Sequence, residues 1–484
     1  MQHDVLSHLE PRAVFHFFEE LSRIPRGSGN TAAASAWCAA FAQERGLPCR
    51  RDEAGNVVIW KAASPGYEDR PAVILQGHLD MVCVQDAGVN HDFASQGLQL
   101  YADGDFVRAR GTTLGGDNGI AVAMILAVLA ENSLPHPPIE AVFTVDEEIG
   151  LLGAAALDCS DLSGRALINL DSEDEGVLTV SCAGGARCDI SGELAVEKAP
   201  GLLCTLTISG LQGGHSGMEI GKGLANANKL LGACLEALSD RVPVRLASLR
   251  GGDQDNAIPK EAQAELVIPL GEAETLAALT NHWAKTAAAE FAATEPGLTA
   301  AFTCQDAPGT HSALGSEDSR QFISLLQAYP NGVLAMSRDI PGLVQTSLNL
   351  GILRLEGGVY QLSSSIRSSV GAEKEALSRR LEELASQFGA QFGQRGDYPA
   401  WEYRKDSPLR ETMVQVFQQQ YGRAPTVEAI HAGLECGLFA GKLPGLDAVS
   451  LGPDLQEVHS TRERLSISST ERTWRYLTAV LAAL

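Results

Sequence analysis

The stretch that decides the fold is IEAVFTVDEEIG, residues 139–150, in which an apolar run ends on three successive acids. An apolar run of this length is typical of a strand buried on both faces of an α/β sheet. The acids Asp146, Glu147 and Glu148 would repel one another at the end of such a strand unless a cation or a substrate lay between them. The stretch therefore predicts a buried strand with a charged ligand at its end.

The first third of the chain repeats this pattern of buried strands between helices. Two more apolar runs end on histidine or acids, in LQGHLD (75–80) and LINLDSED (167–174). Because sites in parallel sheets lie at the carboxyl ends of strands, these ends are expected to meet at one edge. We therefore predict an α/β fold with a mainly parallel sheet. Helices are expected at 14–24 and 119–132, and a further strand at 56–62.

From about residue 186 the pattern changes to alternating apolar and polar residues. It is clearest in VQTSLNLGILRLEGGVYQLSSSIRSS (344–369), where EGG at 356–358 is typical of a hairpin turn. Alternation of this kind favours an antiparallel sheet with one solvated face. We predict an inserted α+β domain at 186–385.

The last hundred residues return to the α/β pattern. The simplest organisation is a catalytic domain formed by 1–185 and 386–484 and interrupted by the inserted domain. Ser468, with Glu471 three residues later, has the spacing of a capping box for the closing helix.

The bulk composition excludes several classes of partner. Sixty acids against 37 bases give a formal net charge of -23, and no Lys/Arg cluster could follow a phosphate backbone or an anionic membrane. The longest apolar run, at 119–130, is too short to cross a bilayer. Ten scattered cysteines without a CxxC pair favour reduced thiols in a cytoplasmic enzyme.

His78 and Asp80 form the first candidate for a metal site. Two residues apart in an extended chain, they share a face, so Asp80 can reach His78 and fix its tautomer, as is typical of metal-bound histidine. A polar strand end would have the same motif. The HxD pattern alone therefore does not decide between the two.

Asp117 lies in the glycine-rich stretch GTTLGGDNGI, just before an apolar helix. Capping of that helix would explain an aspartate. Capping does not explain the glycines at 115, 116 and 119, which suit unusual backbone angles and close approach to a bound group.

Asp171 ends a third apolar strand, so acids from several strands are expected at one edge and need a compensating cation. One divalent ion could compensate these acids, and two would compensate them better. Carboxylate and imidazole ligands without thiolates suit zinc, manganese or cobalt. A second histidine ligand is expected late in the chain, and the pattern leaves His431 and His459 both open.

Several motifs in order carry a resemblance to a known family. They are LQGHLDMV, GTTLGGDNGI, FTVDEEIGLLGA, INLDSEDEG, GGHSG, TSLNLG, HAGLECG and EVHSTRE. Together they resemble the aminoacyl-histidine dipeptidases (Xaa-His or β-alanyl-histidine dipeptidases) of the co-catalytic zinc metallopeptidases. The resemblance covers essentially the whole chain.

The resemblance implies two divalent metal ions, expected to be Zn²⁺, with Co²⁺ or Mn²⁺ as alternatives. It implies that His78 and Asp171 hold one ion, that Glu148 and His459 hold the other, and that Asp117 bridges both. It makes Glu147 the general base for a metal-activated water and Asp80 the residue that orients His78. It also implies a cis peptide bond between Asp117 and Asn118.

The inserted domain is expected to act as a lid and dimerisation domain. The resemblance suggests that His215 in GGHSG reaches the active site of the partner subunit in a homodimer, and that Asn256 in DNAIP is a weaker candidate of the same kind. Arg367 is expected to bind the substrate carboxylate, because its planar fork matches two oxygens. His431 and Glu435 are expected to line the pocket.

The expected function is metal-dependent hydrolysis of dipeptides, preferentially Xaa-His including β-alanyl-histidine. A related amidase with the same metal chemistry is the alternative, whether a tripeptidase, an aminoacylase or a desuccinylase. The alternative from another class is a non-catalytic peptide-binding protein. Such a protein should have lost Glu147 or a ligand, and all of them are present.

Overall fold

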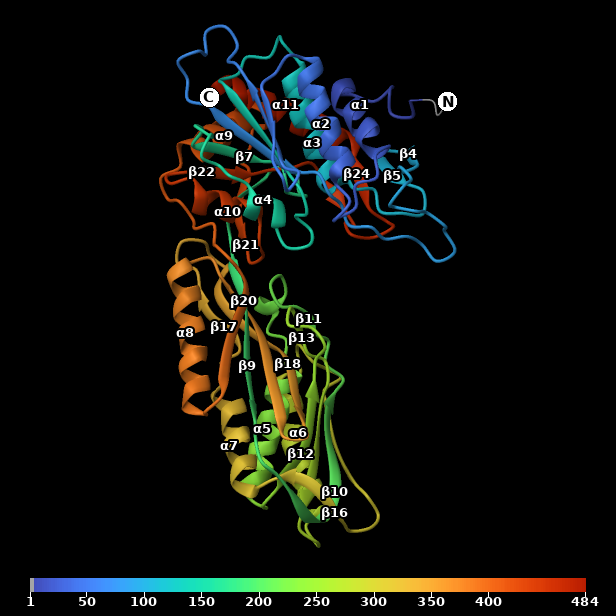
Figure 1. Ribbon diagram of the computed structural model, residues 1–484, viewed down its shortest axis with the longest axis vertical. Coiled ribbons are helices and arrows are strands. Elements are labelled where there is room, and N and C mark those ends of the chain that lie inside the picture. Colours follow the sequence, from blue (N-terminus) through green and yellow to red (C-terminus); the bar gives the residue numbers. More distant parts are fainter. Residues whose placement is uncertain (1–3) are drawn as a thin grey trace. The chain divides into compact units, whose positions relative to one another are not determined.

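A computed structural model describes residues 4–484, which divide into two compact units (Figure 1). Unit 1 comprises the chain up to Cys182 together with Tyr403–Ala429 and Leu434–Leu484, and unit 2 comprises Ala183–Glu402 and Ile430–Gly433. The chain leaves unit 2 only after β20 (Gln391–Tyr398), because this strand pairs with β9 (Gly184–Glu193) in the unit 2 sheet.

The main sheet of unit 1 has eight strands in the order β1-β2-β6-β3-β7-β22-β8-β21. The central strands β6, β3, β7 and β22 are parallel, whereas β2 joins β6, and β8 joins β22, in antiparallel pairs. Every residue of β3 and β6 is buried, which explains why neither sequence alternates. The α/β class is confirmed, with a mixed sheet whose centre is parallel. The strands are β1 (Cys49–Arg51), β2 (Val57–Lys61), β3 (Val73–His78), β6 (Ile139–Thr144), β7 (Ala166–Asn169), β8 (Val177–Cys182), β21 (Thr426–Ile430) and β22 (Asp447–Ser450).

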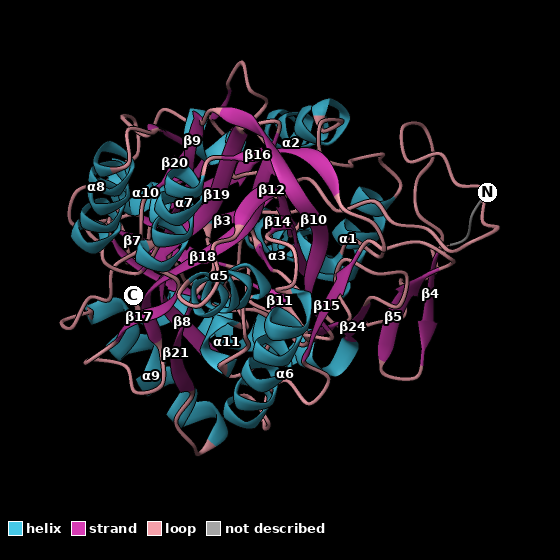
Figure 2. Ribbon diagram, turned by 90° about the horizontal axis from the view of Figure 1, so that it is seen from below, coloured by secondary structure: helices cyan, strands magenta, loops and turns pink. Residues whose placement is uncertain are grey.

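Within residues 4–484, unit 1 also contains seven α-helices. Helices are drawn as cyan ribbons in Figure 2. The helix α3 packs against β3 and α1, and its residues are buried on all sides, which accounts for its continuous apolar sequence. Among the described residues, none of the helices has both the length and the apolar character needed to span a membrane. The helices are α1 (Arg12–Ser22), α2 (Ala32–Glu44), α3 (Gly116–Ala130), α4 (Leu152–Ala156), α9 (Pro408–Tyr421), α10 (Glu435–Lys442) and α11 (Ile467–Ala483).

A small sheet in unit 1 carries the last histidine-containing motif. Its strand order is β23-β24-β5-β4, formed by β4 (Leu100–Asp103), β5 (Phe106–Ala109), β23 (Leu455–Gln456) and β24 (Arg464–Ser466). The strands β23 and β24 are antiparallel partners, so the loop between them, which contains His459, leaves and returns at the same place.

Unit 2 is built on a ten-stranded antiparallel sheet with the main order β15-β10-β14-β12-β18-β19-β9-β20, to which β16 and β17 pair. The predicted hairpin is confirmed, because Glu356 pairs with Val359 across two glycines with positive φ. One hydrophobic core forms between this sheet and the helices α5, α6, α7 and α8. The further strands are β10 (Val196–Ser209), β11 (Gly214–His215), β12 (Arg245–Gly251), β13 (Ala257–Ile258), β14 (Ala262–Ile268), β15 (Thr299–Cys304), β16 (Gly309–Leu314), β17 (Gly332–Met336), β18 (Val344–Glu356) and β19 (Val359–Ser368). The helices are α5 (Ala227–Ser239), α6 (Ala273–Glu290), α7 (Ser316–Ala328) and α8 (Gly371–Gln387), with a 3₁₀ turn at Ile220–Lys222.

One expectation about the cysteines is wrong. The structure joins Cys204 and Cys304 by a disulfide, whereas the sequence pattern indicated only reduced thiols. The two residues are direct partners on the neighbouring strands β10 and β15. Because they are 100 residues apart in sequence, their spacing gives no sign of this pairing.

Candidate metal centre

The parallel strands of unit 1 bring the candidate ligands to one sheet edge. His78 is the last residue of β3, the acids Glu147 and Glu148 follow β6, and Asp171 follows β7. Because β6, β3 and β7 are parallel neighbours, their carboxyl ends meet. The sequence pattern indicated this edge, and the structure places these side chains there.

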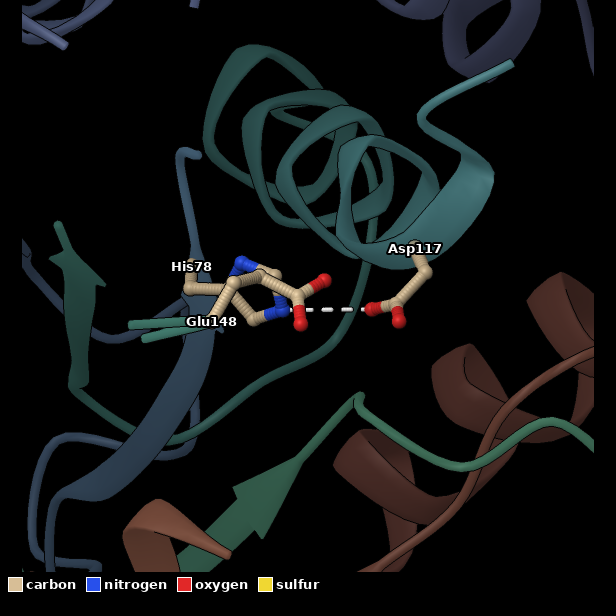
Figure 3. Close-up of side chains that lie close together, drawn as sticks. All are labelled: His78, Asp117 and Glu148. Carbon is tan, nitrogen blue, oxygen red and sulfur yellow. Dashed lines mark hydrogen bonds and ion pairs between the residues drawn. The ribbon is translucent and has the colours of Figure 1, made fainter. Parts of the chain in front are cut away.

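Asp117 lies between two histidines, and each of its oxygens faces one of them. Its Oδ1 is 3.1 Å from Nε2 of His78, a contact drawn in Figure 3, and its Oδ2 is 3.2 Å from Nε2 of His459. His78 Nε2 also lies 3.6 Å from Oδ1 of Asp171, and His459 Nε2 lies 3.0 Å from Oε1 of Glu148. The site therefore consists of two histidine–carboxylate pairs that share one aspartate.

The donor atoms have the separations expected around metal ions. Nitrogen and oxygen ligands about 2.0–2.1 Å from a tetrahedral zinc ion stand about 3.3 Å from one another. The histidine–carboxylate distances of 3.0–3.6 Å bracket this value. Ligand atoms of His78, Asp117 and Glu148 also fall within 4.8 Å of one another. The residues present thus fit a pair of divalent cations.

The backbone at Asp117 agrees with the resemblance, since the Asp117–Asn118 peptide bond is cis, as predicted. The Asn118 side chain accepts a hydrogen bond from the N–H of His78 and donates one to the carbonyl oxygen of Leu170. Asn118 therefore joins the ends of β3 and β7 beside the bridging carboxylate.

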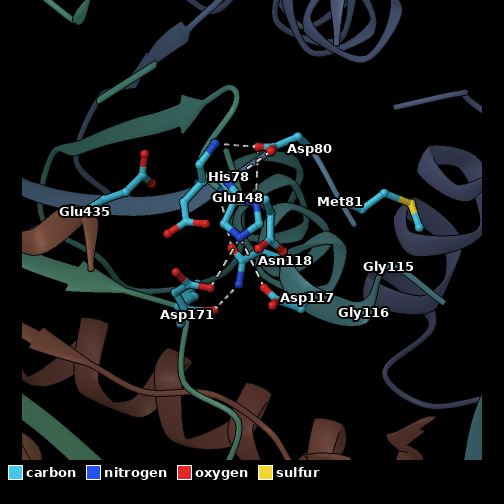
Figure 4. Close-up of polar contacts among 12 residues, drawn as sticks. His78, Asp80, Met81, Gly115, Gly116, Asp117, Asn118, Glu148, Asp171 and Glu435 are labelled. Atoms are coloured by element: carbon cyan, nitrogen blue, oxygen red, sulfur yellow. Dashed lines mark hydrogen bonds and ion pairs between the residues drawn. The ribbon is translucent and has the colours of Figure 1, made fainter. Parts of the chain in front are cut away.

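Asp80 contacts His78 and also the backbone that carries the acids. Its Oδ1 lies 3.4 Å from Nδ1 of His78 and accepts a hydrogen bond from the N–H of Glu147, and its Oδ2 accepts from Glu148 N–H (Figure 4). Burial acts to raise the pKa of Asp80, but its contact with His78 and its hydrogen bonds from Glu147 and Ser28 lower it to about 2. Asp80 therefore stays ionised and fixes both histidine and acids.

The buried carboxylates of the site need positive charge to compensate them. Burial, together with Asp171 and Glu435, raises the pKa of Glu147 well above its ordinary value. Hydrogen bonds to Asp117 and Glu148 raise the pKa of His459 to about 11. Divalent cations would supply the positive charge that protonated histidine supplies here, and would leave the imidazoles neutral as ligands must be.

Non-glycine residues with a left-handed backbone conformation also cluster near this site. In residues 4–484 it occurs at Asp146, Leu151, Glu457 and His459. All four lie in the two loops that carry Glu147, Glu148 and His459. Because such conformations are unfavourable for residues with a Cβ, the surrounding contacts must hold these loops in place.

The candidate substrate-binding residues, apart from Glu435, gather in unit 2. The backbone N–H of Ser216 donates to the carbonyl oxygen of Asn256, which brings the GGHSG and DNAIP motifs together. A Cβ on Gly217 would lie 2.6 Å from the carbonyl oxygen of His431 and 3.0 Å from both Arg367 Nε and the His215 ring. His215, Arg367 and His431 therefore surround one glycine.

The tautomer of His215 follows from its hydrogen bonds. Its Nδ1 accepts from the backbone N–H groups of Gly217 and Met218, both at 3.2 Å. Burial and the charge of Arg367 lower the pKa of His215, which keeps the ring neutral. Its proton therefore lies on Nε2, which makes this atom a hydrogen-bond donor.

Arg367 is a buried cation without a carboxylate partner within ion-pair distance in the described part of the chain. Its exposed fraction is 9%, its Nη1 donates to the hydroxyl of Tyr398, and its Nε has no hydrogen-bond partner. His431 lies beside it, because His431 Nε2 is 2.7 Å from the hydroxyl of Ser347, the strand partner of Arg367. An anion would satisfy this arginine.

Glu435 is a different case from the other pocket candidates. It begins α10 in unit 1 and is fully buried, where its Oε2 accepts from Gln76 Nε2 at 2.5 Å and from the Thr144 hydroxyl at 2.7 Å. Gln76 in turn accepts from Asn169. The network joins β3, β6 and β7 beneath the ligands, so Glu435 supports the strand ends.

Two residues that the sequence reasoning missed contact the Asp117 loop. Arg26 and Glu463 are both buried and hydrogen-bond to its backbone. For Glu463 a signal existed, since it stands four residues after His459 in HSTRE. For Arg26, in IPRGSG, the sequence offers none that we can identify.

The family model described as peptidase family M20/M25/M40 matches residues 74–483. The chain belongs to this peptidase family. The resemblance inferred from the motifs is thereby confirmed.

Individual relatives agree with this assignment to the M20/M25/M40 family. The cytosol non-specific dipeptidase of Escherichia coli (strain K12) is 38% identical over 478 residues, 98% of each chain. The crystal structure of aminoacylhistidine dipeptidase from Vibrio alginolyticus matches with a TM-score of 0.94 at 37% identity, covering 100% of this chain and 98% of that one. Aminopeptidase PepT from Bacillus cereus, at 16% identity and a TM-score of 0.56 over 98% of this chain and 99% of its own, shares the fold.

Proposed function

We propose that this protein is a metal-dependent dipeptidase that hydrolyses dipeptides, Xaa-His dipeptides among them. The observation that carries the proposal is the Asp117 carboxylate, whose two oxygens face two separate histidine–carboxylate pairs. The similar protein of E. coli is named a cytosol non-specific dipeptidase, and that of V. alginolyticus an aminoacylhistidine dipeptidase. The substrate class that both names share is the dipeptide.

Two divalent cations are part of this proposal. His78 and Asp171 would hold one, Glu148 and His459 the other, and Asp117 would bridge them. When bound, the cations supply a water of lowered pKa and polarise the carbonyl of the scissile amide. Nitrogen and oxygen ligands without thiolate suit Zn²⁺, and also Co²⁺ or Mn²⁺.

Glu147 is proposed to move the protons of the reaction. Its backbone N–H is held by Asp80, while its side chain is not part of either histidine–carboxylate pair. A carboxylate so placed takes a proton from the attacking water and returns it to the nitrogen of the leaving amine.

Unit 2 is proposed to recognise the substrate. The guanidinium of Arg367, whose Nε has no hydrogen-bond partner, would bind the terminal carboxylate, with His431 beside it. The Nε2–H of His215 would donate to the carbonyl oxygen as negative charge develops, and Asn256 would assist. These roles would make unit 2 the part of the protein that selects the substrate.

The active form is proposed to be a cytoplasmic homodimer, with contacts through unit 2 and with His215 acting on the partner subunit. Support for the interface comes from β17, which pairs only with β18 in the described chain and exposes Val333, Leu334 and Met336. An exposed apolar edge strand is a ready surface for association.

The test is hydrolysis of β-alanyl-histidine, an alanyl-histidine dipeptide, a dipeptide without histidine and an N-succinyl amino acid. Each is assayed as purified, after chelation, and after restoring zinc. Cleavage of dipeptides that is lost on chelation and restored by zinc is expected. Cleavage of only the succinyl substrate would assign a desuccinylase, and metal-independent cleavage would overturn the mechanism.

A further inference from the structure

Glu463 binds the backbone of the Asp117 loop with its whole carboxylate. It is 3% exposed, and four consecutive N–H groups donate to it. Oε2 accepts from Leu114 at 2.7 Å and from Gly115 at 3.0 Å. Oε1 accepts from Gly116 at 2.8 Å and from Asp117 at 3.3 Å. The carboxylate thus occupies the kind of N–H nest that often binds an external anion.

Arg26 binds the same loop through its carbonyl groups. It is 2% exposed, and its Nη1 donates to the carbonyl oxygens of Leu79 and Asp80, both at 3.0 Å. Its Nη2 donates to the carbonyl oxygen of Gly115. Arg26 therefore links the segment that follows His78 to the loop that carries Asp117.

The two side chains together connect the segments that carry three of the candidate ligands. Arg26 joins the His78 segment to the Asp117 loop, and Glu463 joins that loop to the segment four residues beyond His459. These are the two histidines that face the two oxygens of Asp117. A shift of Arg26 or Glu463 would therefore change the distance from an Asp117 oxygen to His78 or to His459.

The glycines of the loop are explained by these side chains. A Cβ on Gly119 would lie 2.6 Å from Arg26 Nη2, and a Cβ on Gly116 would lie 3.2 Å from Glu463 Oε1 and 2.5 Å from Leu455. The sequence pattern predicts that these glycines make room for a bound group. At these two positions the groups that approach belong to the chain itself.

Stability alone gives little reason for this arrangement. Taking a carboxylate and a guanidinium out of water is unfavourable for each ion, and buried charged groups often add no more stability than apolar residues of the same volume. What charged groups do add is fixed geometry, because each makes several short, directional hydrogen bonds to backbone. The arrangement therefore favours a role in positioning.

We propose that Arg26 and Glu463 are positioning residues that hold Asp117 between His78 and His459, and that the affinity of the site for divalent metal depends on them. This proposal rests on the metal centre of the proposed function. It concerns the bridging position, since both residues act on the Asp117 loop.

The test compares two buried carboxylates of unit 1 that both accept backbone N–H groups. Glu463→Gln keeps the shape but turns an amide NH₂ toward two N–H donors. Glu140→Gln is the matched control, because Glu140 accepts from Ser163 and Gly164 and lies near the amino end of β6, away from the ligands. Zinc affinity and stoichiometry are measured by competition with a chelator, alongside the thermal midpoint of the metal-free protein.

We expect Glu463→Gln to weaken zinc binding by about 10- to 100-fold, as is typical for loss of a group that orients ligands. kcat should fall with little change in KM, and Glu140→Gln should bind zinc like the wild type even where its thermal midpoint falls as far. Equal zinc affinity in wild type and Glu463→Gln would overturn the proposal. If the wild type itself bound no zinc, the proposed function would fail instead.

A second variant covers the case in which Glu463→Gln does not fold. Arg26→Lys keeps the buried charge but cannot reach the carbonyl oxygens on both sides, so the same loss of zinc affinity is expected. Unchanged affinity would overturn the proposal. Failure of both variants to fold would also overturn it, because the pair would then serve the fold itself.

Discussion

The carboxylate of Asp80 accepts a hydrogen bond from the backbone N–H of Glu147 at 3.0 Å. The same oxygen lies 3.4 Å from Nδ1 of His78. One buried carboxylate therefore orients a candidate metal ligand and the candidate general base together. Because the contact with Glu147 is through its backbone, the Glu147 side chain stays free to exchange protons.

Asp80→Asn should impair both the orientation of His78 and the positioning of Glu147. An amide group keeps the volume but offers one acceptor oxygen where the carboxylate offers two, and it lacks the charge that holds the His78 ring. We expect zinc affinity to fall about 10- to 100-fold, as is typical for partners of metal-bound histidine. Chelator competition measures this, and kcat should fall at saturating zinc as well. Wild-type affinity and kcat would contradict the assigned role.

Glu147→Gln should separate chemistry from metal binding. The amide cannot accept the proton of the attacking water, so kcat should fall about 10²- to 10⁴-fold, the usual contribution of a general base. Zinc stoichiometry should stay at the wild-type value, because Glu147 is not part of either histidine–carboxylate pair. Full hydrolysis by this variant would remove Glu147 from the mechanism.

The sequence predicted those parts of the site that depend on local pattern. His78, Glu148 and Asp171 end or follow buried strands, and parallel strands bring their ends together whatever the details of packing. The contacts of Arg26 and Glu463 with the Asp117 loop could not be predicted in this way, although Glu463 stands four residues after His459 in the EVHSTRE motif. Glu463 meets Asp117 across 346 positions of the sequence, and a buried carboxylate bound by backbone looks like any surface acid in a sequence.

Local pattern also failed at one helix start. The spacing of Ser468 and Glu471 predicted a capping box for the last helix. In the structure Ser466 caps α11 by accepting from the N–H of Ser469, while the Ser468 hydroxyl donates to Asp105. Both serines suit a cap, and the contact of Ser468 with distant Asp105 decides between them.

A helix with few buried residues was also not predicted from the sequence. The structure has α6 at Ala273–Glu290, which the sequence reasoning did not identify. Its buried residues are only Leu276, Thr280 and Ala287. With so few buried residues, the alanine-rich sequence of α6 shows only a weak helical periodicity of apolar residues. The helix is recognised in the structure, where it packs on α5 and β15.

Arg367→Met should weaken recognition of the terminal carboxylate. Loss of hydrogen bonds between charged groups corresponds to about 10- to 100-fold in kcat/KM. The substitution should raise KM for a dipeptide with a free C-terminus. It should have no effect on the same dipeptide with an amidated C-terminus, which the wild type should already cut poorly. Equal losses for both substrates would show that Arg367 does not bind the carboxylate.

His431 should make stability depend on pH. Burial and the charge of Arg367 lower its pKa from 6.5 to about 4. Between these values the unfolded chain binds a proton that the folded chain does not, so the free energy of unfolding falls as pH drops from 6.5 toward 4. The slope from this one group is about 1.4 kcal/mol per pH unit.

Urea unfolding of the metal-free protein with chelator present measures this effect. The stability advantage of wild type over His431→Gln should shrink as pH falls through that window and be constant above it. His282→Gln, at an exposed position of α6, is the control and should follow the wild type. A constant difference between wild type and His431→Gln would show that His431 is not held neutral.

His215 provides the sharpest test of the assembly. If it acts on the partner subunit, a protomer with Glu147→Gln and an intact His215 can complete the site of a protomer with His215→Ala and an intact Glu147. Each variant alone should be nearly inactive. Mixing equal amounts under conditions of subunit exchange should restore about a quarter of wild-type activity, because half of the symmetric dimers are mixed and each has one complete site. If His215 acts within its own subunit, every site in the mixture lacks one group. Activity then stays at the level of the separate variants, and the role in the partner subunit is excluded.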